Sequence, residues 1–167
     1  MNRGNEIRCY DYVNRPYAEV RDALMKDALA IFQSATRAAA SRAQSVAVEL
    51  RADVGAIGLE AEIVISVKNV EENAGAMSDP LTRLRLEWRA AKMPALFPFM
   101  QAELAIYPLT STETQLDFSG MYEPPLGPLG KALNAVALHR IAESSVHRFV
   151  ADVAEYLRQA LAPAATV

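Results

Sequence analysis

The stretch TQLDFSGMYEPPLGPLG, residues 114–130, is where the chain changes its structural period. Up to Tyr122, apolar and polar residues alternate, with Leu116 and Phe118 on the apolar side, and a period of two is typical of a strand. The next residues carry adjacent prolines and two glycines. Proline lacks the amide that a sheet ladder needs, and glycine permits tight turns. The sequence therefore predicts that a sheet ends here and that a different element follows.

Beyond this stretch the apolar residues recur about every 3.6 positions, which is typical of an amphipathic helix. We expect one long C-terminal helix from about Gly127 to Leu161, because Pro163 then marks its end. Its apolar stripe would consist of Leu129, Leu133, Val136, Leu138, Ala142, Val146, Phe149, Val150, Val153 and Leu157.

Before the stretch, alternation extends back to Val46 and is interrupted by short turn-like links rich in glycine, asparagine and proline. Each segment has one apolar and one mainly polar face, which predicts an antiparallel meander covered on one side. Five strands are expected here, beginning near Val46, Leu59, Arg83, Met100 and Leu116.

The N-terminal part predicts one further strand and a helix. Residues 7–13 alternate, and Asn14 followed by Pro16 is a typical helix start, with asparagine as the cap. The Ala-rich residues 34–45 are compatible with either a helix or a loop. The apolar stripe of the helix would consist of Tyr17, Val20, Leu24, Ala28 and Ile31.

Together these elements predict an α+β fold. A curved antiparallel sheet of about six strands would wrap on the long C-terminal helix, with an N-terminal helix after the first strand. A sheet with one apolar face must cover that face, and the C-terminal helix has the length to do so. One helix need not fill the space enclosed by a strongly curved sheet, so we expect a cavity between the sheet and the helix. No repeat, linker or charge block divides residues 1–167, so a single domain is predicted.

Composition excludes several classes of protein. The chain has 167 residues, of which 51% are apolar and 22% charged, as in soluble globular proteins. A net charge of −3 argues against nucleic acid as a partner. The longest uncharged run, residues 93–102, is far shorter than the roughly 20 apolar residues of a membrane span. One cysteine, Cys9, and the polar N-terminus predict a cytoplasmic location.

The 114–130 junction resembles the strand-to-helix junction of bacterial proteins in the START-like superfamily, also called SRPBCC. The order of elements from about Ile7 to Leu161 is similar to the helix-grip fold of that superfamily. Its members include polyketide cyclases, lipid-transfer domains, plant hormone receptors and pollen allergens. The resemblance implies an interior pocket, open at one end, for an apolar or amphipathic small molecule. It implies no reaction, because the superfamily holds both binders and enzymes.

Residues expected to line this pocket come from the apolar sheet face and the long helix. Trp88 and Tyr122 combine a large ring with a polar edge, which suits a pocket and a core equally well. Arg140 would hold an acidic group of a ligand by paired hydrogen bonds, or would cover apolar surface with its stem. The candidate ligand-binding residues are Leu86, Trp88, Met100, Leu104, Phe118, Tyr122, Leu133, Val136 and Arg140.

Catalytic and metal-binding signatures are sparse. His139, Glu143 and His147 share one helix face, and these residue types bind metals or exchange protons. Three ligands along one straight helix do not converge on one ion, so no metal and no other cofactor is predicted. Cys9 lies on an apolar strand face and is expected to behave as a small hydrophobe. No catalytic residue is assigned.

A row of arginines on one strand, Arg83, Arg85 and Arg89, would point outward from the sheet. Such a row can contact phosphates. We expect instead a solvated charged face, on which Glu60 and Glu62 of the neighbouring strand pair with these arginines.

We therefore expect binding, transport or sequestration of an apolar or amphipathic small molecule between sheet and helix. One alternative is an enzyme of the polyketide aromatase/cyclase or dehydratase type. Its proton-transfer candidates would be Tyr122, His139, Arg140 and Glu143. The other alternative is a ligand-free protein-interaction module that acts through the outer sheet face. The oligomeric state is left open, although an exposed edge strand would permit a dimer.

Overall fold

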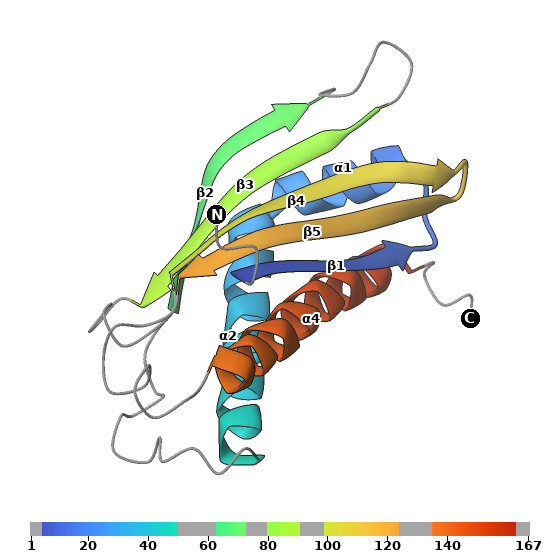
Figure 1. Cartoon of the computed structure of the whole chain (residues 1–167). Coiled ribbons are helices and arrows are strands. Elements are labelled where there is room, and N and C mark those ends of the chain that lie inside the picture. Colours follow the sequence, from blue (N-terminus) through green and yellow to red (C-terminus); the bar gives the residue numbers. More distant parts are fainter. Residues whose placement is uncertain (1–4, 50–62, 73–79, 91–98, 124–134, 163–167) are drawn as a thin grey trace.

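The computed structural model describes residues 5–49, 63–72, 80–90, 99–123 and 135–162. In these ranges five strands form one antiparallel sheet, and three helices flank it (Figure 1). The strands are β1 (Glu6–Val13), β2 (Ile63–Glu72), β3 (Thr82–Ala90), β4 (Phe99–Thr110) and β5 (Glu113–Glu123). The helices are α1 (Tyr17–Lys26), α2 (Ala28–Glu49) and α4 (Ala135–Ala160).

The strands are ordered β1-β5-β4-β3-β2 across the sheet. Strands β2 to β5 form the predicted meander, each pairing antiparallel with the next. Strand β1 pairs with β5 instead of β2, because α1 and α2 carry the chain from one sheet edge to the other. Figure 1 shows a bent sheet with α4 running obliquely beneath β1. The predicted α+β fold, with a long C-terminal helix against an antiparallel sheet, is confirmed.

The expected strand near Val46 is wrong, since α2 continues through this position to Glu49. An alternation of only a few residues does not separate the two periods, and the Ala-rich residues before it have high helix propensity. The helix therefore extends into the valines. The described part of the sheet consequently has five strands, not six.

The start of the first helix also differs from the expectation. Pro16 is the N-cap residue of α1 and no side chain caps the helix, so Asn14 does not have the predicted role. The expected single helix is divided at Asp27, which ends α1 immediately before α2 begins.

Two expected element ends lie outside the described residues. The strand predicted near Leu59 is described from Ile63 onward, and the helix predicted from Gly127 is described from Ala135 onward. The candidate ligand residue Leu133 also lies outside the described ranges.

The apolar sheet face is buried against the helices, and Phe149 of α4 lies at the centre of the contact. Its ring centroid is 5.3 Å from that of Trp88, 5.8 Å from that of Phe118 and 5.9 Å from that of Phe32. Trp88 and Phe118 also stack on each other at 5.8 Å. We call these four residues the aromatic cluster. It joins β3 and β5 of the sheet to both α2 and α4.

Helices α2 and α4 pack on each other, and their buried residues include several alanines. Ala35 and Ala39 of α2 are buried, as is Ala142 of α4. Small residues at a helix contact reduce the distance between the helix axes. The Ala-rich composition that left this segment open in the sequence therefore serves helix packing.

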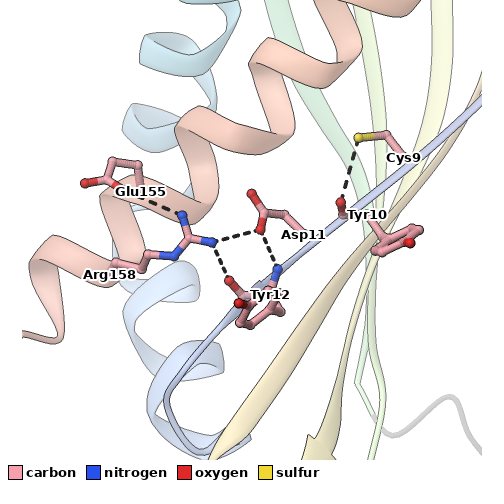
Figure 2. Close-up of polar contacts among 6 residues, drawn as sticks. All are labelled: Cys9, Tyr10, Asp11, Tyr12, Glu155 and Arg158. Carbon is pink, nitrogen blue, oxygen red and sulfur yellow. Dashed lines mark hydrogen bonds and ion pairs between the residues drawn. The ribbon is translucent and has the colours of Figure 1, made fainter.

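At its C-terminal end α4 is attached to the edge strand β1 by Arg158. One guanidinium nitrogen of Arg158 lies 2.8 Å from Asp11 Oδ1 and donates to the backbone carbonyl of Tyr12 at 2.6 Å (Figure 2). The same carboxylate oxygen accepts the Tyr12 amide at 2.8 Å. Glu155, one turn earlier, lies 3.5 Å from the other guanidinium nitrogen. These contacts fix the register between β1 and α4.

The outer sheet face carries a network of ion pairs. Arg83 lies 2.9 Å from Glu103 and 3.7 Å from Glu71, and Arg89 pairs with Glu87 on the same strand. The described carboxylates of this network lie on strands β2, β3 and β4. The expected partners Glu60 and Glu62 lie outside the described residues.

We predict that Phe149→Ala lowers the free energy of unfolding by about 3–5 kcal/mol, because it removes a buried ring that contacts three others. Denaturant unfolding followed by the fluorescence of Trp88, the single tryptophan, measures the loss. Tyr156→Ala, on an exposed position of the same helix, is the control and should cost much less. Equal losses in the two variants would contradict the central place of Phe149.

Candidate functional site

The candidate site lies at one end of the buried sheet face. Trp88 pairs with Met100 across β3 and β4, and Met100 pairs with Tyr122 across β4 and β5. Ile65 of β2 extends the same line beside Trp88. All of them are buried. We call Trp88, Met100 and Tyr122 the site row. It is close to the ends of these strands, where β3 stops at Ala90 and β5 at Glu123.

Gly120 permits the close packing beside the site row. A Cβ atom at this position would lie 2.9 Å from Met100 Sδ and 2.9 Å from Phe118 Cε1. It would also lie 3.3 Å from the Cβ of Ala102. Contacts under about 3 Å are repulsive, so the space above Gly120 belongs to Met100 and Phe118. The glycine in the quoted stretch thus leaves room for the Met100 side chain on the buried face.

A hydrogen bond connects the site row to α4. The Tyr122 hydroxyl lies 3.2 Å from His139 Nδ1, and the two ring centroids are 6.0 Å apart. Tyr122 is only 4% exposed, and this burial raises the pKa of its phenol above the ordinary value of 10.0. The phenol is therefore neutral at physiological pH. It can donate to the imidazole or accept from it, according to the tautomer of His139.

The other sheet candidates lie deeper on the same buried face. Leu86 and Leu104 are 2% and 1% exposed. Phe118 is fully buried and belongs to the aromatic cluster. Trp88 belongs to both the site row and the aromatic cluster, so its ring has a core role whether or not a ligand contacts it.

The two described helix candidates lie elsewhere. Val136 is 78% exposed, so it does not contribute to the buried face between α4 and the sheet. Arg140 is exposed and lines a cleft whose described residues all come from α2 and α4. The structure instead brings His139, the neighbour of Arg140, to the site row.

His139, Glu143 and His147 do not converge. His139 contacts Tyr122, whereas the Nε2 atom of His147 lies 4.0 Å from Glu143 Oε1 in the cleft between α2 and α4. Within the described ranges no three His, Cys, Asp or Glu residues are grouped so that they could hold a metal ion. No helix in these ranges is long and apolar enough to cross a membrane.

Cys9 is buried on β1, and its Sγ atom lies 3.5 Å from His147 Nδ1. A longer contact to the Tyr10 carbonyl, at 4.0 Å, is drawn in Figure 2. Burial, followed by the nearby carboxylates of Asp11, Asp117 and Glu143, raises the pKa of the thiol to about 11. The protonated thiol is a weak donor and a poor nucleophile, which agrees with the expected hydrophobic role.

Sequence reasoning missed two features of this site. It offered His139 only as a metal-binding or proton-transfer candidate and did not pair it with Tyr122. Tyr122 lies at the end of β5 and His139 in the first turns of α4, so the two are close in sequence, and this proximity was the available signal. It also treated Phe149 as one of many stripe residues. Its contacts with Trp88 and Phe118 depend on how α4 lies on the sheet.

We predict that Cys9 reacts with iodoacetamide at pH 8 at least about a hundredfold more slowly in the native protein than in the denatured chain. The pKa of about 11 is two units above the ordinary 9.0, and the thiolate is the reactive species. Rates are followed by mass spectrometry, with denatured protein as the reference. A native rate within a few fold of the denatured rate would show an accessible, ionised thiol.

We predict that Tyr122→Phe lowers stability by about 1 kcal/mol at neutral pH, because the hydrogen bond to His139 is lost. Above pH 10 the stability difference between the wild-type protein and the variant becomes smaller. The unfolded chain ionises this phenol first, so the wild-type protein loses stability as pH rises above 10, and the variant lacks this contribution. Denaturant unfolding at pH 7 and above pH 10 measures both effects. Tyr10 lies on β1 and is 74% exposed, so Tyr10→Phe is the matched control. It should not change the stability at either pH.

No protein-family model matches the chain, and a search of curated proteins also finds no match. Among solved structures, the chain is similar to the Zhui aromatase/cyclase from a Streptomyces species, at 13% identity and a TM-score of 0.44, over 97% of this chain and 98% of that one. A conserved protein from Geobacillus kaustophilus is 11% identical, with a TM-score of 0.46 over 92% and 95% of the two chains. Ara h 8.0201 is 7% identical, with a TM-score of 0.44 over 92% and 97%. The element order and strand pairing of the described residues show an α+β fold, in which a five-stranded antiparallel sheet packs with helices that include the long α4.

Proposed function

We propose that this protein binds an apolar or amphipathic small molecule between the sheet and α4, next to the site row, and carries or sequesters it. The observation that carries the proposal is the Tyr122–His139 hydrogen bond beside the buried Trp88 and Met100, at one end of a mostly apolar buried face. Ligand pockets combine mostly apolar walls with a few placed polar groups. Trp88 and Met100 would supply apolar walls, and the hydrogen-bonded Tyr122 and His139 would supply the polar groups.

The two kinds of contact have different roles. Apolar burial supplies about 25 cal/mol per Å² and favours any ligand of suitable size. The Tyr122 hydroxyl and the His139 ring can exchange their mutual hydrogen bond for bonds to a ligand, which orients a polar head at this end. An amphipathic molecule would therefore place its apolar part over Trp88 and Met100 and its polar group at Tyr122.

The first test is native mass spectrometry of freshly purified protein, repeated after denaturation and solvent extraction. A stoichiometric extra mass that disappears on denaturation is the expected result. The extracted molecule is then titrated back while the fluorescence of Trp88 is recorded. We expect Tyr122→Phe to weaken the binding of a polar-headed ligand by about tenfold, the value of one hydrogen bond, and Tyr10→Phe to leave it unchanged.

If neither the purified protein nor a panel of fatty acids and aromatic compounds gives a bound mass or a change in Trp88 fluorescence, the binding proposal is wrong. The ligand-free interaction module, acting through the charged outer sheet face, would then take its place. A cytoplasmic location and a single domain over residues 1–167 stay predictions.

The same hydrogen bond favours one second function, an enzyme of the aromatase/cyclase or dehydratase type. A neutral phenol in contact with an imidazole can pass a proton to or from a bound carbonyl compound. Of the expected proton-transfer residues, Tyr122 and His139 lie together, whereas Arg140 and Glu143 line the cleft between α2 and α4. Under this function Tyr122→Phe would abolish turnover of a polyketide analogue while Trp88 fluorescence still reports its binding.

A further inference from the structure

A cleft lies between α2 and α4, and none of the site-row residues lines it. Its volume is about 450 Å³. All of its described lining residues are polar or charged, in contrast to the buried sheet face. They are Arg42 of α2 and, on α4, Arg140, Glu143, Ser144, His147 and Arg148.

The α4 residues reach this cleft because of their spacing. Arg140, Ser144 and Arg148 are four residues apart and therefore lie on successive turns of one helix face. Arg42 approaches from α2, so cationic groups border the cleft from both helices. Because α2 and α4 pack on each other, the backbone positions that carry these groups are held close together.

On the α4 side of the cleft, the described residues carry more positive than negative charge. Two guanidinium groups, those of Arg140 and Arg148, lie beside one carboxylate, that of Glu143, whereas the whole chain has a net charge of −3. Glu143 lies 4.0 Å from His147 Nε2. Among the described residues neither Arg140 nor Arg148 forms an ion pair. Like charges gathered in one cleft repel one another, and an anionic ligand relieves this cost.

The orientation of the His147 ring is set from the other side. Its Nδ1 atom contacts the buried Cys9 thiol at 3.5 Å, so Nε2 is the nitrogen directed toward Glu143 and the cleft. A ring anchored by one nitrogen presents the other in a defined direction. The cleft therefore has one preoriented side chain beside its arginines.

We propose that this cleft binds the phosphate or diphosphate group of a small molecule. Arginine forks bind oxyanions by paired hydrogen bonds, and phosphate groups accept from several directions. Arg140 and Arg148 together offer more donors than the two oxygens of a carboxylate can accept. The Ser144 hydroxyl adds a further donor at the same cleft.

The test is calorimetric titration of the full-length protein with inorganic diphosphate at constant ionic strength. We expect saturable binding that weakens by about tenfold in Arg140→Gln and in Arg148→Gln, because each removes charge-assisted hydrogen bonds. Arg37→Gln is the matched control. This exposed arginine of α2 does not line the cleft, and its replacement changes the net charge equally. Its dissociation constant should equal that of the wild-type protein.

Absence of saturable binding, or equal weakening in Arg37→Gln, would overturn the proposal, because the second result would reflect net charge alone. Succinate binding as tight as diphosphate binding would overturn the assignment to phosphate. Tyr122→Phe should leave diphosphate binding unchanged, since the cleft and the site row are separate. Failure of diphosphate binding would therefore not bear on the function proposed for the site row, and the reverse also holds.

Discussion

The contact of the Phe149 ring with Trp88, Phe118 and Phe32 is the constraint on which the other parts of this structure depend. It joins two strands that are distant in sequence to two helices, and it buries the largest side chains of the apolar face. Because interiors are close-packed, the position of this one ring fixes where α4 lies on the sheet. The two ends of α4 are then placed against different polar groups of the sheet.

These two ends have different chemistry. At the C-terminal end, Arg158 pairs with Asp11 and holds the edge strand, which is a structural contact. At the N-terminal end, Tyr122 and His139 form a single hydrogen bond beside the apolar site row. An ion pair with several hydrogen bonds resists exchange, whereas one neutral hydrogen bond is readily exchanged for a ligand. The function we propose therefore belongs to the N-terminal end of α4.

The divergence of His139 and Arg140 follows from helix geometry. Successive residues of a helix are rotated by about 100°, so neighbours in sequence face different surroundings. His139 is directed to the sheet, and Arg140 is directed to the cleft shared with α2. A difference of one position in the apolar stripe decides which of them can contact a ligand between sheet and helix. One helix thereby serves two chemically distinct surfaces.

The sequence by itself determined the α+β class, the meander from β2 to β5, the long C-terminal helix and the identity of the buried sheet residues such as Leu86, Met100 and Leu104. These follow from periods of two and 3.6, which local sequence expresses directly. The short alternation near Val46 led to the wrong prediction of a strand, because a few residues do not define a period. Only the tertiary structure decided that His139, not Arg140, meets Tyr122, and that arginines from α2 and α4 share one cleft. Both depend on the rotation and crossing of packed helices, which arise from contacts between residues far apart in the chain.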